Sequence, residues 1–169
     1  MKDYAKLPLF IITGASGSGK TTIVPHLREL LPEFDVFDID EELLTNAVGD
    51  WQIVKNIWMR IASHIAKSNR MTILCGTQMP WEIKKCEDYK EFSQILFLNL
   101  HCDDRVREKR LLERGWSNEL IKEHNQFAKW LIENADKEYE PPMVMIDTSN
   151  TSVNEVSLKV KDWVEKYVR

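Results

Sequence analysis

Short apolar runs alternate along the chain with longer segments in which apolar residues recur every three or four positions. The apolar runs are continuous, a pattern that is typical of strands buried on both faces of a sheet. We predict five strands, at about residues 7–13, 34–38, 71–75, 95–100 and 143–147. Because helical segments separate them, these strands are expected to run parallel, with crossover helices on both faces.

The amphipathic segments predict helices between these strands. They lie at about residues 19–31, 41–47, 50–68, 103–114, 117–135 and from 152 onwards, and Pro80 opens a further helical turn. In segment 50–68 an isoleucine recurs every four residues, and we expect this stripe (Ile53, Ile57, Ile61 and Ile65) to pack in the core. The predicted fold class is α/β, with a five-stranded parallel sheet between two helical layers. With no repeat or linker in its 169 residues, the chain is expected to form a single domain over residues 1–169.

The stretch between the first strand and the first helix carries the most specific chemical signal. It fits the pattern Gly-x-x-x-x-Gly-Lys-Ser/Thr. Backbone N–H groups of such a loop, and the positive end of the following helix dipole, hold phosphate groups. Lys20 is expected to reach the β- and γ-phosphates of a nucleoside triphosphate, and the Thr21 hydroxyl to ligate Mg²⁺. The predicted triphosphate-binding residues here are Gly14, Ala15, Ser16, Gly17, Ser18, Gly19, Lys20, Thr21 and Thr22.

Two carboxylates follow the second strand. Ligands of a parallel sheet bind beyond the carboxyl ends of its strands, and Asp38 and Asp40 are two residues apart, so both can face one cavity. Asp38 is predicted either to hold the hydration shell of Mg²⁺ or to accept the proton of an acceptor hydroxyl. Asp40 is predicted to hydrogen-bond that hydroxyl or its neighbour. A solvated acidic turn that caps the next helix is the alternative.

The third strand ends at Gly76 and Thr77, where a glycine lets an acceptor approach the backbone closely. No aspartate ends this strand, and the guanine-reading Asn-Lys-x-Asp motif is missing, which argues against a GTPase or a motor ATPase. Arg60 is the residue of segment 41–68 that suits an anionic acceptor. Trp51 and Trp81 are candidates to flank a flat substrate, although tryptophans more often pack.

Arginines are frequent after the fourth strand. Arg110 and Arg114 are four residues apart and share a helix face, from which two guanidinium groups can stabilise charge on a transferred γ-phosphate. An exposed, salt-bridged helix is the alternative for this pair, and it is our interpretation of Arg105 and Arg107. Thr148, after the fifth strand, is expected either to border the nucleotide base or to form a polar turn.

Composition narrows the partners and the compartment. The net charge is −4 and no basic stripe is present, which argues against a nucleic-acid partner. The three cysteines lack Cys-x-x-Cys spacing, so we expect free thiols in a reducing compartment, and the four histidines show no metal-ligand spacing. No apolar segment has the length of a signal peptide or of a membrane span. We therefore expect a cytoplasmic protein without a membrane partner.

In combination, these motifs resemble the small P-loop kinases, which include the adenylate, shikimate and gluconate kinases and the chloramphenicol phosphotransferases. The resemblance implies a P-loop NTPase fold with strand order 2-3-1-4-5, an acceptor-binding segment at about 41–68 and a short lid at about 110–120. It also implies that Asp38 and Asp40 serve the metal and the acceptor hydroxyl, and that Arg110 and Arg114 are lid arginines. The Cys-Gly-Thr, Pro-Trp and Arg-Gly-Trp sequences are similar to a nucleoside-kinase-like, ATP-binding branch of the same superfamily.

These features predict an ATP- and Mg²⁺-dependent phosphotransferase that acts on a hydroxyl of a nucleoside, metabolite or antibiotic. The predicted catalytic residues are Lys20, Asp38, Arg110 and Arg114; Arg110 and Thr148 also bind the nucleotide; Thr21 and Asp38 bind the metal; Asp38, Asp40, Arg60, Gly76 and Thr77 bind the acceptor. One alternative is a nucleoside monophosphate kinase, in which Arg60 meets the acceptor phosphate. Another is a regulatory ATP-binding switch, since no aspartate ends the third strand. The acceptor, the choice between ATP and GTP, and the choice between monomer and homodimer stay open.

Overall fold

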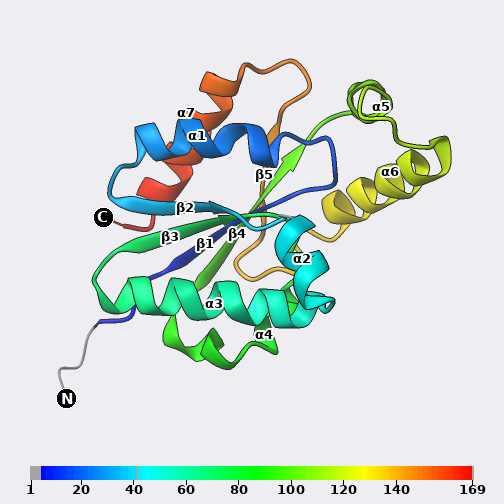
Figure 1. Ribbon diagram of the computed structural model, residues 1–169. Helices are drawn as coiled ribbons and strands as arrows, with labels where there is room; N and C mark the ends of the chain where they lie inside the picture. Colours follow the sequence, from blue (N-terminus) through cyan, green and yellow to red (C-terminus); the bar gives the residue numbers. More distant parts are fainter. Residues whose placement is uncertain (1–4, 41, 169) are drawn as a thin grey trace.

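A five-stranded parallel sheet organises the computed structural model, which describes residues 5–40 and 42–168. The strand order is β2-β3-β1-β4-β5, as the resemblance implied (Figure 1). The strands are β1 Leu9–Thr13, β2 Phe34–Asp38, β3 Met71–Cys75, β4 Ile95–His101 and β5 Val144–Asp147. The helices are α1 Lys20–Leu30, α2 Glu42–Val48, α3 Trp51–Lys67, α4 Pro80–Lys84, α5 Asp104–Leu112, α6 Asn118–Glu133 and α7 Val153–Glu165, with a 3₁₀ helix, η1, at Glu87–Glu91. Glu41, where we expected the short second helix to begin, lies outside the described residues.

The central strand, β1, is buried along its whole length. It pairs with β3 on one side and β4 on the other, so that Ile11 lies between Leu74 and Phe97. This position explains the unbroken apolar run, because side chains of a central strand meet helices on both faces of the sheet. The carboxyl end of β1 leads directly into the glycine-rich loop.

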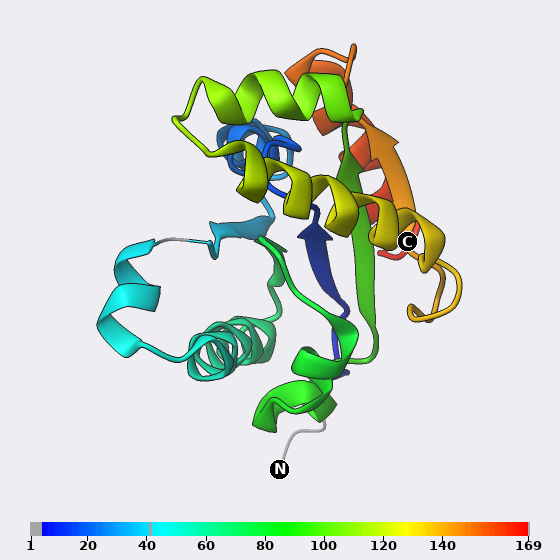
Figure 2. The same cartoon turned by 90° about the vertical axis from the view of Figure 1, so that its right-hand side faces the viewer.

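Two helical layers cover the sheet. Helices α1 and α7 pack on one face, where Phe10 of β1 meets Trp163 of α7 edge to face at 5.3 Å (Figure 1). Side chains of α3, α4 and α6 cover the other face, around Leu9, Ile11, Met59 and Leu131. Figure 2 shows α5 and α6 joined by a short connection at the end of the sheet toward which β1 points.

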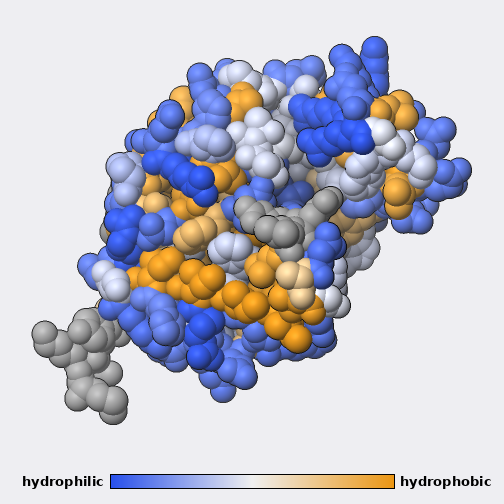
Figure 3. Space-filling view, viewed as in Figure 1, coloured by the Kyte–Doolittle hydropathy of each residue, from blue (hydrophilic) through white to orange (hydrophobic). Residues whose placement is uncertain are grey.

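The isoleucine stripe of α3 does not pack in the core as we expected. Ile53 is 49% exposed, and the buried apolar side chains of this helix are Val54, Met59 and Ala62. The reason is geometric: with 3.6 residues per turn, a four-residue repeat drifts by about 40° at each step. The stripe therefore winds around α3: Ile53 is exposed, and Ile57, Ile61 and Ile65 are half-buried. An apolar band runs along α3 on the surface (Figure 3).

Two further expectations concern the cysteines and the membrane. Cys75, Cys86 and Cys102 are free, as the spacing predicted, and all three are buried. Within the described residues, no helix combines the length and the apolar character that crossing a membrane requires.

Candidate functional site

The glycine-rich loop, residues 14–19, which we call the phosphate loop, connects β1 to α1 at the carboxyl edge of the sheet. Gly19 precedes the first helical residue in the left-handed conformation, at φ 99°. Few residues other than glycine adopt this conformation without strain. The loop therefore delivers the chain to the N-terminus of α1, where free backbone N–H groups and the helix dipole favour an anion.

Lys20 folds back over this loop. Its Nζ donates hydrogen bonds to the carbonyls of Gly14 at 2.7 Å and Ala15 at 3.4 Å, and it lies 3.8 Å from Asp40 Oδ2. Burial lowers the pKa of the Lys20 ammonium, while the nearby Asp40 carboxylate opposes that shift. The ammonium thus lies at the mouth of the phosphate loop and faces a carboxylate across it.

Asp40 is held by the end of β3. Both oxygens of its carboxylate accept the backbone N–H of Thr77, at 3.1 and 3.2 Å. A Cβ added to Gly76 would lie 2.4 Å from Ile39 Cγ1 and 2.7 Å from Asp40 Oδ1. The space beside Gly76 is thus filled by Ile39 and Asp40 of the chain itself, and the lack of a side chain at Gly76 makes room for the Asp40 carboxylate. Burial raises the pKa of Asp40, and the Lys20 ammonium opposes this rise.

The two predicted carboxylates lie together but in different settings. Asp38 ends β2, and its Oδ1 accepts the backbone N–H of Asp40 at 3.2 Å. Asp40 also borders a narrow pocket that we call the Gln78 pocket. It is lined by Asp40, Trp51, Lys55, Trp58, Thr77 and Gln78, with Ile39 and Val54. Asp40 therefore connects the phosphate loop with this pocket. Thr77, which was predicted to bind the acceptor, also lines the pocket, and its backbone N–H holds the Asp40 carboxylate.

On the other side of the loop, Arg110 and Thr148 meet. Arg110 donates to the carbonyl of Gly17 at 2.8 Å and to that of Thr148 at 3.1 Å. The Thr148 hydroxyl donates to the carbonyl of Ser18 at 2.8 Å. Both residues, together with Arg114 and Thr22, line a pocket of about 280 Å³ beside the loop. A pocket in this position suits a nucleotide base, so the predicted nucleotide-binding residues Arg110 and Thr148 lie together.

Two residues that contact the loop were not predicted. Arg107, which we interpreted as exposed, is fully buried and donates to the carbonyls of Ser16 at 2.9 Å and Cys102 at 2.8 Å. The signal that could have found it is its i, i+4 spacing to the buried Leu111. His124 Nδ1 accepts the Ser16 backbone N–H at 3.3 Å. The spacing of the histidines assigns His124 no site role, although it lies on the apolar face of the helix predicted at 117–135.

Arg60 lies on a different surface from the phosphate loop. Its guanidinium group pairs with Asp88 and, at 2.9 Å, with Glu87 of η1. The hollow that it borders is lined by the exposed side of α3 and by η1. The described contacts therefore do not bring Arg60 together with Lys20 and Asp40, and its predicted role toward an acceptor gains no support from them.

The residues predicted for Mg²⁺ offer only oxygen donors, the Thr21 hydroxyl and the Asp38 carboxylate. Among the described residues, no three His, Cys, Asp or Glu side chains form a metal-binding group. Mg²⁺ in phosphoryl-transfer sites is commonly held by one or two protein oxygens together with water and substrate phosphates. The donor set therefore fits a magnesium ion that arrives with the nucleotide.

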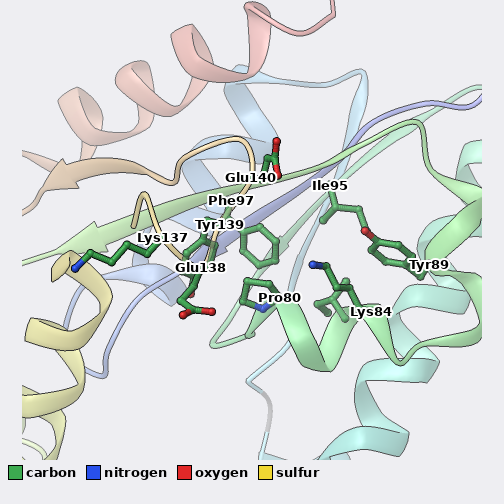
Figure 4. Close-up of a pocket in the computed structure, with 10 residues that line it drawn as sticks. Pro80, Lys84, Tyr89, Ile95, Phe97, Lys137, Glu138, Tyr139 and Glu140 are labelled. Carbon is green, nitrogen blue, oxygen red and sulfur yellow. The ribbon is translucent and has the colours of Figure 1, made fainter. Parts of the chain in front are cut away.

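A larger cavity, of about 460 Å³, lies apart from the phosphate loop. Its walls come from α4, η1, β4 and residues 137–140. Phe97 and Tyr139 form the apolar part, edge to face at 5.1 Å, with Lys84 and Glu138 nearby (Figure 4). None of its lining residues belongs to the predicted site.

Comparison with known proteins shows the family to which the chain belongs. The family model described as AAA domain matches residues 11–139. The shikimate kinase of Bacillus cytotoxicus is 26% identical over 160 residues, which cover 88% of this chain and 93% of that protein. A sugar kinase from Janibacter sp. has a similar structure, with a TM-score of 0.64, 16% identity and 95% coverage of each chain.

A second solved structure, the shikimate kinase of Acinetobacter baumannii in complex with shikimate, covers 98% of this chain and 97% of its own, with a TM-score of 0.56 and 18% identity. These likenesses span nearly the whole chain, and the family model includes the phosphate loop, Asp38, Asp40 and Arg110. The chain thus belongs to the AAA-domain family and has the fold of the small P-loop kinases.

Proposed function

We propose that this chain is an ATP-dependent phosphotransferase that moves the γ-phosphate to a hydroxyl group of a small, uncharged molecule. The observation that carries the proposal is the position of Asp40. Its carboxylate is fixed by the Thr77 N–H, lies 3.8 Å from the phosphate-loop Lys20, and borders the Gln78 pocket. A hydrogen-bond acceptor at the junction of a phosphate site and a second pocket suits an incoming hydroxyl nucleophile.

The roles of the residues follow from this arrangement. Lys20 and the loop N–H groups bind the β- and γ-phosphates, and the Lys20 charge stabilises the oxygens of the transferred group. Asp40 orients the acceptor hydroxyl. Burial raises the Asp40 pKa, which makes its carboxylate a better proton acceptor than an exposed aspartate. The two arginines predicted as catalytic, Arg110 and Arg114, line the adjacent nucleotide pocket, from which a guanidinium group can reach phosphate oxygens.

Thr21 and Asp38 would hold Mg²⁺, directly or through water. When bound, the ion neutralises charge on the phosphate oxygens. Asp38 accepts the N–H of Asp40, so the residue proposed for the metal also fixes the backbone of the residue proposed for the acceptor. Asp38→Asn is expected to abolish turnover while nucleotide binding largely remains, as measured by calorimetry; unchanged turnover would contradict this assignment.

Charge favours a neutral acceptor over the nucleoside monophosphate considered above. Lys55 is the one cationic residue among the described residues that line the Gln78 pocket, and Glu82 Oε1 neutralises it at 2.6 Å. An acceptor phosphate is usually bound by unpaired arginines. Arg60, the arginine predicted for that task, is paired with two carboxylates on another surface.

The test is ADP release from MgATP in the presence of pooled acceptors. One set of pools contains uncharged hydroxyl compounds (nucleosides, sugars and uncharged antibiotics), and the other contains nucleoside monophosphates. We expect a hydroxyl pool to stimulate release, and Lys20→Ala to abolish it. Stimulation by the monophosphates alone would establish the alternative acceptor class. ATP binding without stimulation by any pool would favour a regulatory switch.

A further inference from the structure

Gln78 is a buried polar side chain to which the roles assigned above give no function. Gln78 is 1% exposed, and within the described part of the chain neither its Nε2 nor its Oε1 has a hydrogen-bond partner. Its backbone is anchored, because its N–H donates to Thr13 Oγ1 at 3.3 Å at the end of β1. A buried amide that lacks partners costs free energy, and native proteins rarely keep one without a reason. A ligand that supplies both partners removes this cost.

The pocket around Gln78 has a distinct chemistry. Trp51 and Trp58 give it aromatic walls, and the Nε1 of Trp58 is also buried without a partner among the residues that the structure describes. The one cation of these described walls, Lys55, is paired with Glu82. The carboxamide presents a hydrogen-bond donor and an acceptor side by side in one plane. These groups together select an uncharged, flat molecule whose edge carries an adjacent donor and acceptor.

We infer that the phosphate acceptor is a nucleoside, whose base hydrogen-bonds through its edge to the Gln78 carboxamide while a sugar hydroxyl meets Asp40. Carboxamides recognise nucleobases through paired hydrogen bonds of this kind. Gln78 directly follows Thr77, whose N–H fixes Asp40, so the backbone links the base contact to the hydroxyl contact. This inference rests on the proposed transfer to a hydroxyl and narrows its substrate class.

Entry of a base requires one wall of the pocket to move. The space inside is about 10 Å³, which holds roughly one water molecule. Of the walls, Trp51 is the most open: it is 50% exposed and is the first residue of α3. Movement of its indole ring opens the pocket toward solvent and leaves an aromatic surface beside the base, as stacking requires.

The experiment measures binding without catalysis. Adenosine, guanosine, cytidine and uridine are titrated singly into the protein by calorimetry in the presence of a non-hydrolysable ATP analogue, with ribose as the ligand that lacks a base. We expect at least one nucleoside to bind and ribose not to bind. Gln78→Met should weaken the binding of that nucleoside by about tenfold to a hundredfold, which is the effect of losing a paired hydrogen bond to the base. The exposed Gln94→Met is the matched control and should bind as the wild type does.

Gln78→Glu separates recognition from a merely structural role. Glutamate keeps the shape of the side chain but removes both donors, so the order of preference among the four bases should change. The inference fails if no nucleoside binds, or if nucleosides bind equally to the wild type and to Gln78→Met. Transfer to a sugar, unaffected by Gln78→Met, would leave the proposed function standing and overturn the inference. Nucleoside binding that depends on Gln78 but leads to no phosphate transfer would support the contact between Gln78 and the base and would contradict the proposed function.

Discussion

At the scale of single residues, the position of the Asp40 carboxylate depends on the absence of a side chain at Gly76. A methyl group there would lie 2.7 Å from Asp40 Oδ1 and even closer to Ile39. We predict that Gly76→Ala displaces the carboxylate, lowers turnover by at least about tenfold and lowers the free energy of unfolding by about 1–3 kcal/mol, as overpacking does. Steady-state kinetics and urea unfolding measure the two effects.

The control is Gly49→Ala. Gly49, unlike Gly76, has a positive φ, 72°, and a Cβ added there meets none of the described atoms within 4 Å. Its substitution should cost stability through backbone strain without moving Asp40. Normal turnover by Gly76→Ala would show that catalysis does not need the observed position of Asp40.

His124 gives the protein a predictable dependence of stability on pH. Burial, followed by the charges of Lys20 and Arg107, lowers the pKa of His124 below its ordinary value of 6.5. In the folded state its neutral Nδ1 accepts the Ser16 N–H. Below pH 6.5 the unfolded chain gains a proton on this residue that the folded chain does not, so the free energy of unfolding falls as the pH falls toward the lowered folded pKa.

Urea unfolding between about pH 7.5 and 5.5 tests this account. His124→Asn keeps a hydrogen-bond acceptor near Ser16 but does not titrate. It should reduce the loss of stability at acid pH without abolishing it, because burial also lowers the pKa of His101. An identical pH dependence in the variant and the wild type would refute the assignment.

The residues that the sequence predicted and those it missed differ in how they are specified. Lys20 belongs to a local motif, and the carboxyl end of a strand fixes Asp40, so pattern and topology predict both. Arg107 and Gln78 are buried polar residues, and their environment depends on which side of a helix or loop turns inward. That choice is made by packing among distant segments, which a single sequence does not reveal.

At the scale of elements, α5 supports the phosphate loop through Arg107. The side chain lies across the loop and donates to the carbonyls of Ser16 and Cys102. Arg107→Met would leave both carbonyls with one partner fewer inside the protein. We predict a loss of about 2–4 kcal/mol in the free energy of unfolding and weaker ATP binding, because a buried charged donor is removed.

Arg105→Met is the matched control, since Arg105 is exposed on the same helix. Its substitution should change the free energy of unfolding by less than about 0.5 kcal/mol. Thermal unfolding of the two variants, with and without MgATP, separates the stability effect from the binding effect. Equal behaviour of the two variants would contradict a supporting role for Arg107.

Helix α3 illustrates a limit of prediction from element patterns. Its existence and its bounds followed from periodicity, and Asp50 caps it by accepting the N–H groups of Gln52 and Ile53. Its orientation did not follow, because two apolar faces compete for the core. The isoleucines are more apolar, but the face of Val54, Met59 and Ala62 is the one that packs on the sheet.

At the scale of the whole molecule, the strand order explains why the site forms where it does. With β3 and β4 on either side of β1, the segments after β1, β2 and β3 meet at one edge, and the loop after β5 reaches Ser18. Alternation of strands and helices predicted the layers, and the phosphate-loop motif with its resemblance predicted the order. The contacts of Lys55 and Arg60 depend on how α3 meets α4 and η1, which neither signal specifies.

The central claim is that the γ-phosphate passes to a hydroxyl acceptor and not to water. The most direct measurement uses ATP that carries a radiolabel on the γ-phosphate, with the hydroxyl pool that stimulates ADP release, and separates organic phosphate esters from inorganic phosphate. The account predicts that the label appears in an ester, and that Lys20→Ala and Asp38→Asn abolish this product. Label released only as inorganic phosphate, or retained in ATP with every acceptor, would contradict it.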